Sequence, residues 1–245
     1  SISDKIKNPE NIYGCDLDEI AVFIAKINLI VKFKNIEFNP NIYNLDFLLQ
    51  NKIPQNYFDI IATNPPWGAM AKNDYFNRFP FIKSKESFSY FIAISFDYLK
   101  NEGKCFFVLP ISILNVKVHS DIRNFILDNF SILEIICYGQ IFESVLSDVV
   151  ALKLKKGKGE GFVHIKTSTM EEKIPIEVYQ KNINNIFSLY GIQDYKILNK
   201  IYSKPHKTLQ NSTWGLGIVT GNNKKFITEK SKNLEKIYSG KNLSK

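Results

Sequence analysis

Short apolar runs alternate with segments whose apolar residues recur at helical spacing, and this alternation limits the possible folds more than any other feature. The apolar runs are expected strands, and they cover Asn11–Cys15, Phe58–Thr63, Cys105–Pro110, Ile132–Tyr138 and Val149–Leu154. A run as uniformly apolar as Cys105–Leu109 is typical of a strand covered on both faces. The alternation therefore predicts an α/β fold built on a doubly wound, Rossmann-like sheet.

Three segments between these runs read as helices. Two cover Asp18–Leu29 and Val116–Phe130, and the third begins after Ser84. In the third, apolar residues recur at helical spacing until Asn101-Glu102-Gly103, the expected C-terminal cap. The last two strands are joined by a short loop, and we expect them to form an antiparallel pair at one edge of the sheet.

The second expected strand ends at Asn64-Pro65-Pro66-Trp67, and this sequence indicates a particular chemistry. Two prolines remove two backbone donors and fix φ at about −65°, so the loop that follows the strand is conformationally restricted. The Asn64 side chain and the Pro65 carbonyl can accept hydrogen bonds from a planar amine and draw its nitrogen toward tetrahedral geometry, as its methylation requires. Trp67 offers a flat face for stacking. The structural alternative is that the prolines merely end a strand.

Two carboxylates lie where a cofactor could meet such a site. Asp16 follows the first strand and can accept two hydrogen bonds from a ribose diol; its structural alternative is helix capping, which Asp18 can also perform. Asp46 can accept from an adenine amine while Phe47 packs on the ring; its alternative is a turn beside a core aromatic. Ligands of doubly wound sheets bind beyond the carboxyl ends of the strands, where Asp16 and Asn64 lie.

In this order, Gly14-x-Asp16-Leu17-Asp18, Asp46-Phe47 and Asn64-Pro65-Pro66-Trp67 resemble successive motifs of one family. It comprises the class I S-adenosylmethionine-dependent methyltransferases that modify the exocyclic amine of adenine in DNA. The resemblance implies that Asp16 with Leu17 binds the cofactor ribose and that Asp46 with Phe47 binds its adenine. It also implies that Asn64 and Pro65 position the target amine, with Pro66 completing the motif, and that Trp67 stacks on the base.

A further match is Ile141-Phe142-Glu143, followed by a strand that begins near Val149. It resembles the family loop whose aromatic contacts the other face of the extruded base, so Phe142 would complete a sandwich with Trp67. Such enzymes flip the nucleotide out because an amine inside a duplex is inaccessible. The alternative for Phe142 is a buried core aromatic at a strand boundary.

Charge divides the chain unevenly. Residues 1–150 carry 14 Lys/Arg and 17 Asp/Glu, whereas residues 151–245 carry 18 and 7, a net charge of +11 that should attract a polyanion. A basic face without a partner is the alternative. We expect a methyltransferase domain over 1–185, then a linker and the beginning of a target-recognition domain over 186–245.

Two segments of the basic part resemble the target-recognition region of bacterial restriction-modification methyltransferases. They are Gly217–Phe226 and Ile237–Leu243. The resemblance implies that double-stranded DNA is the partner. Lys224 and Lys225 are then expected to contact phosphates, and Asn222 and Asn223 to contact base edges.

The family's first motif is a glycine-rich turn that cradles the methionine part of the cofactor about twenty residues before the first acidic position. Residues 1–13 contain no glycine. We therefore expect the sheet to be incomplete at its N-terminal side and this chain alone to transfer methyl groups weakly or not at all. The missing strand and turn would come from an N-terminal segment or from another subunit.

Other features exclude several classes of protein. The three cysteines and three histidines show no metal-ligand spacing, so no metal is expected, and no apolar stretch reaches the length of a membrane span. We expect a cytoplasmic protein without a nuclease motif. Two enzymatic alternatives share the Asn-Pro-Pro-aromatic motif, namely RNA-base and protein-glutamine methyltransferases. A non-catalytic DNA-binding remnant is the third alternative.

Overall fold

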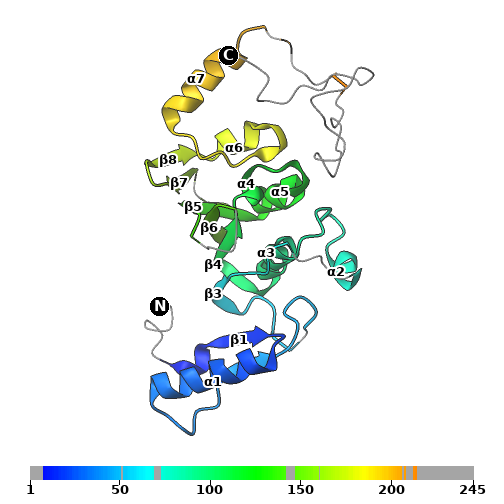
Figure 1. Ribbon diagram of the computed structural model, residues 1–245, viewed down its shortest axis with the longest axis vertical. Coiled ribbons are helices and arrows are strands. Elements are labelled where there is room, and N and C mark those ends of the chain that lie inside the picture. Colours follow the sequence, from blue (N-terminus) through cyan, green and yellow to red (C-terminus); the bar gives the residue numbers. More distant parts are fainter. Residues whose placement is uncertain are drawn as a thin grey trace, which may run out of the picture. The chain divides into compact units, whose positions relative to one another are not determined.

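The computed structural model describes residues 8–50, 52–68, 73–141, 147–159, 161–205, 207 and 212–213. The chain divides into two compact units, residues 1–201 and 202–245, and nearly all described residues belong to the first. The strands are β1 (Tyr13–Asp16), β2 (Asn41–Asn44), β3 (Phe58–Thr63), β4 (Leu99–Pro110), β5 (Phe130–Gly139), β6 (Val149–Lys156), β7 (Phe162–Lys166) and β8 (Glu171–Pro175). The helices are α1 (Glu19–Phe33), α2 (Asn73–Arg78), α3 (Ser87–Tyr98), α4 (Ser112–Asn115), α5 (Ser120–Asn129), α6 (Glu177–Lys181) and α7 (Ile192–Tyr202) (Figure 1). The domain division expected at residues 185 and 186 stays a prediction.

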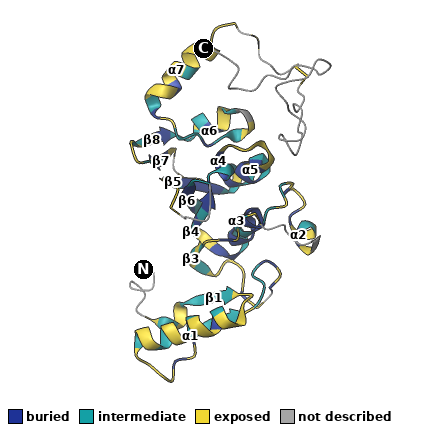
Figure 2. Ribbon diagram, in the orientation of Figure 1, coloured by how far each residue is buried: buried dark blue, intermediate teal, exposed yellow. Residues whose placement is uncertain are grey.

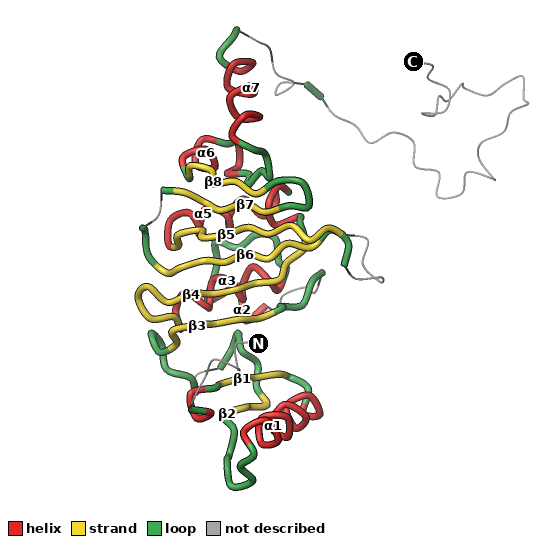
Figure 3. Tube along the Cα trace, turned by 90° about the vertical axis from the view of Figure 1, so that its left-hand side faces the viewer, coloured by secondary structure: helices red, strands yellow, loops and turns green. Residues whose placement is uncertain are grey.

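The strands form two separate ladders, and the alternation of strands with helices confirms the α/β class. The larger sheet has the order β3-β4-β6-β5-β7-β8, and β1 and β2 pair with each other in parallel (Figure 3). Strand β3 also pairs in parallel with β4, whereas β6 runs antiparallel to both β4 and β5. Parallel pairing places the carboxyl ends of β1 and β2 together, and likewise those of β3 and β4.

The expected antiparallel pair of the last two strands is confirmed in direction, but its place at the edge is wrong. These strands are β5 and β6, and β5 pairs on its other side with β7 in parallel, which in turn pairs with β8. The sequence of β8 is Glu171-Glu172-Lys173-Ile174-Pro175, in which only Ile174 is buried. A strand this short and charged has no apolar alternation to reveal it, because it lies at the sheet edge.

The ends of two helices show how local sequence sets the elements. Helix α1 begins at the cap Asp18, whose side chain accepts from the Ile20 N–H at 2.8 Å, and ends at Lys34 in the left-handed region with φ 52°. Helix α3 ends at Tyr98 rather than at the expected cap at Gly103. Gly103 instead lies in β4, where a Cβ atom would meet the Lys100 carbonyl oxygen at 2.8 Å.

The main core lies on the helical face of the larger sheet. Helix α3 packs against β4 and helix α5 packs against β5 (Figure 3). On this side Cys105, Phe107 and Leu109 of β4 are buried, whereas the alternating Phe106 and Val108 are only half-buried. The uniformly apolar run therefore does not have both faces equally covered among the described residues.

A buried arginine joins two parts of this core. Arg123 of α5 is fully buried, and its guanidinium donates to the carbonyl oxygens of Ile113 (2.8 Å), Val116 (2.9 Å), Asn184 and Asn185. Burial lowers the pKa of Arg123 to about 10. The side chain therefore satisfies carbonyl groups that would otherwise be buried without donors, and it ties the segment after α6 to the helical layer.

Replacing Arg123 with Met should destabilise the protein by about 3 kcal/mol or more, because several buried carbonyls lose their donor together. Urea denaturation followed by circular dichroism measures the change. Lys117→Met, at an exposed position just before α5, is the matched control and should stay within about 0.5 kcal/mol of the parent protein. Equal urea midpoints for the two variants would show that the hydrogen bonds of Arg123 do not stabilise the fold.

Candidate functional site

The strand ends predicted to carry chemistry surround one cavity of about 660 Å³. It is lined by the expected site residues Asp16, Leu17, Asp46, Phe47, Asn64, Pro65 and Pro66. These residues come from three segments far apart in the sequence. The parallel β1-β2 ladder joins the two acidic segments, and the Asn64 segment follows β3 of the larger sheet. The proposed roles of the individual side chains remain predictions.

The two acidic segments are tied to each other by backbone contacts at the end of the β1-β2 ladder. Asp16 and Asn44 are register partners, and the Asn44 side chain donates to the carbonyl oxygens of Asp16 (3.2 Å) and Leu17 (2.9 Å). The Leu45 N–H donates to the same Asp16 oxygen at 3.0 Å. Strand β2 has only four residues and sequence reasoning missed it, although it fixes the place of Asp46.

The exposed carboxylate of Asp16 accepts one hydrogen bond from its own turn. Its Oδ1 accepts from the Asp18 N–H at 2.9 Å, and Asp18, rather than Asp16, is the N-cap of α1. The capping role that competed with a ligand role for Asp16 is thus performed by Asp18. An ionised carboxylate has further lone pairs, so Asp16 retains capacity to accept from a ligand.

Asp46 is oriented by two hydrogen bonds. Its Oδ1 accepts from the Leu48 N–H at 2.9 Å and its Oδ2 accepts from the Tyr75 hydroxyl at 2.5 Å. The neighbouring Phe47 ring stacks on Phe91 of α3, with the ring centroids 5.6 Å apart. Tyr75 and Phe91 also line the cavity, and sequence reasoning assigned neither to the site. A tyrosine in the short polar helix α2 gives no recognisable signal in a single sequence.

Electrostatics shows that the two carboxylates act on the same space. Burial, followed by the negative charges of Asp16 and Asp46, raises the pKa of the Cys15 thiol to about 11. At the base of β1, a 3.1 Å hydrogen bond with the Tyr57 hydroxyl is the main cause that raises the pKa of Tyr13 to about 12. The negative charges of both carboxylates thus reach the Cys15 thiol, while the Tyr13 phenol lies at the other end of β1.

The Asn-Pro-Pro-Trp loop stands at the carboxyl end of β3. Asn64 is exposed and also borders a second cavity, of about 500 Å³, beside Phe106 and Tyr138. Pro65 is buried, which anchors the loop. The Trp67 indole does not line the larger cavity, and its Nε1 donates to the Val108 carbonyl oxygen of β4 at 3.2 Å.

Five other expected site residues lie outside the described part of the chain. They are the aromatic Phe142 and the expected DNA-contacting residues Asn222, Asn223, Lys224 and Lys225. Their assignments remain those of the sequence.

The larger cavity runs along strand edges rather than over a sheet face. All four residues of β1 line it, and so do the consecutive residues 60–63 of β3. Successive side chains of a strand point to opposite faces, so a cavity bordered by consecutive residues follows the edge of the strand. Within the described residues no strand pairs with the second edge of β1 or of β3. At one end the Tyr13 and Phe58 rings meet, with centroids 5.4 Å apart.

Helix α1 packs against β1 and β2. Its sequence is largely apolar, and yet most of the helix is exposed or half-buried (Figure 2). Only Val22 of its fifteen residues is buried, while Ile20, Phe23 and Val31 are each more than 60% exposed. A helix apolar on most sides is normally covered by protein. Among the described residues, therefore, α1 presents an exposed apolar surface.

In the part of the chain that the structure describes, no group of three or more His, Cys, Asp or Glu is placed to hold a metal ion. Nor does any of its helices combine the length and apolar character needed to cross a membrane.

Comparison with known proteins identifies the family and the fold of the chain. The model of the Eco57I restriction-modification methylase family matches residues 10–142, which include all three strand-end motifs. A relative, the Type II methyltransferase M.VspI of Vibrio sp. (strain 343), is 31% identical over 247 residues. That match covers 97% of this chain and 60% of the relative, so the chain spans about three fifths of the relative's length.

Solved structures share the fold at lower identity. A putative class I S-adenosylmethionine-dependent methyltransferase from Listeria monocytogenes superposes with a TM-score of 0.55 and 18% identity, over 77% of this chain and 54% of that one. A nuclease-deletion mutant of the Type ISP restriction-modification enzyme LlaGI, solved with a DNA substrate mimic, superposes with a TM-score of 0.58 and 16% identity. The match covers 80% of this chain and 26% of that one. These likenesses confirm the predicted methyltransferase-type α/β fold.

The raised pKa of Cys15 predicts a particular pH dependence of its alkylation. Only the thiolate reacts, so the rate with iodoacetamide should be low at pH 8 and should rise until pH approaches about 11. Peptide mass spectrometry after timed quenching measures the rate at Cys15 separately from the other cysteines. A rate that levels off near pH 9 would contradict the buried, negatively charged surroundings of this thiol.

Proposed function

The chain belongs to the Eco57I restriction-modification methylase family, and from this premise we propose that the protein containing it methylates adenine in DNA. In the proposed reaction the exocyclic amine of a flipped adenine receives the methyl group of S-adenosylmethionine. The observation that carries the proposal is the convergence of Asp16, Asp46 and Asn64 on one cavity.

We propose that each carboxylate binds a separate part of the cofactor. Asp16 is exposed at the end of β1 and suits the ribose diol, with Leu17 beside it. Asp46 is half-buried and held in place by hydrogen bonds, as recognition of an adenine amino group requires, and Phe47 offers a ring next to it. The S-adenosylmethionine dependence of the Listeria monocytogenes structure supports this choice of cofactor.

Asn64 and Pro65 are proposed to accept hydrogen bonds from the target amine. Both line the cavity, so the amine would lie next to the space proposed for the cofactor. These acceptors would draw the nitrogen toward tetrahedral geometry and so keep its lone pair out of conjugation with the ring. S-adenosylmethionine, when bound, would supply the methyl group from its sulfonium, with S-adenosylhomocysteine as the leaving group and the amine proton passing to solvent. The bond from Trp67 Nε1 to Val108 would hold the indole rigid as a stacking surface, with Phe142 on the other face of the flipped base.

Double-stranded DNA is the proposed substrate and partner. The LlaGI structure that shares the fold contains a DNA substrate mimic, and residues 151–245 of this chain carry the net positive charge that a phosphate backbone attracts. Lys224 and Lys225 are proposed to meet phosphates and Asn222 and Asn223 base edges, within a target-recognition region that begins after residue 185. A cytoplasmic location follows from this substrate.

The larger cavity, which β1 and β3 border, supports a further proposed partner, a strand that completes the sheet. Among the described residues no strand pairs with the second edge of β1 or of β3. The two strands begin at the Tyr13–Phe58 contact and end at Asp16 and Asn64 on the same cavity, so a strand parallel to both would satisfy both edges. Its carboxyl end would deliver a glycine-rich turn next to Asp16. An N-terminal segment of the same protein or another subunit would supply it, and transfer by residues 1–245 alone should be weak without it.

Family membership favours DNA over the RNA-base and protein-glutamine alternatives. A non-catalytic DNA-binding remnant has no need for two carboxylates and an Asn-Pro-Pro loop around one cavity, so the same convergence favours catalysis.

Asn64→Ala should reduce methyl transfer to DNA by about 10²-fold or more, because an acceptor that acts on the reacting amine is lost. Transfer of a tritiated methyl group to duplex DNA by the whole protein measures the rate, and gel shift measures DNA affinity. Affinity should change less than about twofold, since Asn64 does not bind the phosphate backbone.

Asp59→Asn is the matched control. Asp59 belongs to the same strand β3 but does not line the cavity, and its carboxylate pairs with Lys100 at 2.8 Å on the surface. This variant should keep the parent rate. Full methylation by Asn64→Ala would contradict the proposed role of the loop.

A further inference from the structure

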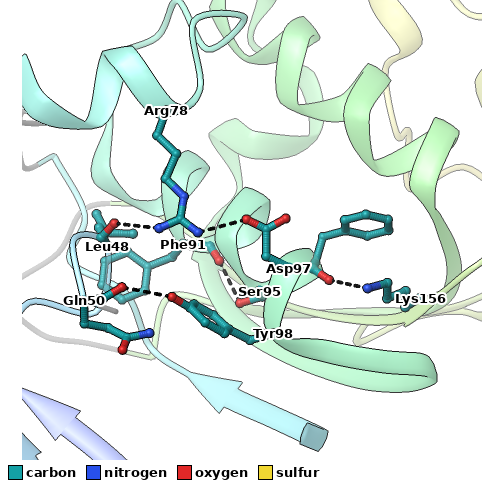
Figure 4. A network of polar contacts seen from close by, with 9 residues as sticks. Leu48, Gln50, Arg78, Phe91, Ser95, Asp97, Tyr98 and Lys156 are labelled. Carbon is teal, nitrogen blue, oxygen red and sulfur yellow. Dashed lines mark hydrogen bonds and ion pairs between the residues drawn. The ribbon is translucent and has the colours of Figure 1, made fainter. Parts of the chain in front are cut away.

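The segment 46–50 is held by side chains from two helices (Figure 4). Arg78 of α2 approaches the Leu48 carbonyl oxygen at 3.5 Å and pairs with Asp97 of α3 at 3.0 Å. The Tyr98 hydroxyl donates to the Gln50 carbonyl oxygen at 3.2 Å. These contacts fix the backbone of the segment, whereas Tyr75 of α2 donates to the Asp46 carboxylate itself.

The contact between Tyr75 and Asp46 differs from the others because it acts on a proposed ligand-binding group. Tyr75 is buried, lines the same cavity as Asp46, and donates to Asp46 Oδ2 at 2.5 Å. The Leu48 N–H holds the other oxygen at 2.9 Å. A donor on each oxygen fixes the plane of the carboxylate, and an ionised carboxylate offers about four lone-pair directions in total.

The hydroxyl of Tyr75 is a permanent donor in this arrangement. Burial and then the bond to Asp46 raise the pKa of Tyr75 above its ordinary value, so the group stays protonated at any pH at which the enzyme would work. Its ring also lies against Tyr90 of α3, with centroids 5.9 Å apart. The ring is therefore anchored by packing while the hydroxyl points at Asp46, which is what precise orientation of a carboxylate requires.

We propose that Tyr75 is a positioning residue that orients the Asp46 carboxylate to accept a hydrogen bond from the 6-amino group of the cofactor adenine. This inference rests on the proposed function and deepens it, because it names the residue that orients the proposed acceptor for the cofactor base.

The test compares two ligands in the whole protein by titration calorimetry. They are S-adenosylhomocysteine and its hypoxanthine analogue, which has a 6-oxo group in place of the 6-amino donor. The parent protein should prefer the adenine ligand. Tyr75→Phe should weaken binding of the adenine ligand by about tenfold, as loss of an oriented charged acceptor predicts, and should change binding of the hypoxanthine ligand by less than about twofold.

Tyr98→Phe is the matched control. It removes another buried hydroxyl that bonds to the same segment, but through the Gln50 backbone rather than through Asp46. If Tyr98→Phe lowers affinity, it should do so equally for both ligands. A merely structural role for Tyr75 would give the same result for Tyr75→Phe, with the affinity for both ligands lowered alike. A second measurement on Asp46→Asn combined with Tyr75→Phe should show little additional loss of selectivity beyond that of Asp46→Asn alone.

The outcomes separate this inference from the function beneath it. A parent protein that binds neither ligand would contradict the proposed function, and this inference with it. A parent protein that discriminates between the ligands, together with a Tyr75→Phe variant that keeps the same discrimination or loses both affinities equally, would overturn the role of Tyr75 alone.

Discussion

Parallel strand pairing is the interaction on which the candidate site depends. Hydrogen bonding of β1 to β2 places Asp16 level with Asn44, two residues before Asp46, and pairing of β3 with β4 fixes the strand that ends at Asn64. Pairing of β1 with β2 joins Asp16 to the segment of Asp46, and contacts of Tyr13 with Tyr57 and Phe58 join β1 to the start of β3. Residues separated by almost fifty positions in the sequence thus meet around one cavity. Side-chain contacts then refine this placement, since Asn44 joins the two acidic segments and Tyr75 orients Asp46.

The same ladders leave a physical requirement unmet in the described residues. Strands β1 and β3 each border the cavity with an edge that no described strand pairs, although backbone groups in an apolar setting need partners. Helix α1 packs against β1, and its exposed apolar side chains likewise lack a covering element among the described residues. A parallel strand followed by a covering segment would satisfy the backbone groups and the apolar surface together. In the proposed function, cofactor binding is thus linked to completion of the sheet.

Sequence reasoning succeeded where one residue type or a long pattern decides the structure. The capping of α1 by Asp18 and the strand before Asn64 follow from local chemistry. The short strand β2 and the edge strand β8 were missed, because four or five residues with polar neighbours carry no clear periodicity. Tyr75 was missed for another reason. Its importance comes from a contact with Asp46, 29 positions away, which no local pattern contains.

In the proposed function, the acidic strand ends and the Asn64 loop serve transfer of a methyl group to adenine. Identification of the modified base tests it most directly. Duplex DNA incubated with the whole protein and S-adenosylmethionine, then digested to nucleosides and analysed by mass spectrometry, should contain N6-methyladenine and no other methylated base. Methylation of cytosine, or of RNA or protein in place of DNA, would contradict the account.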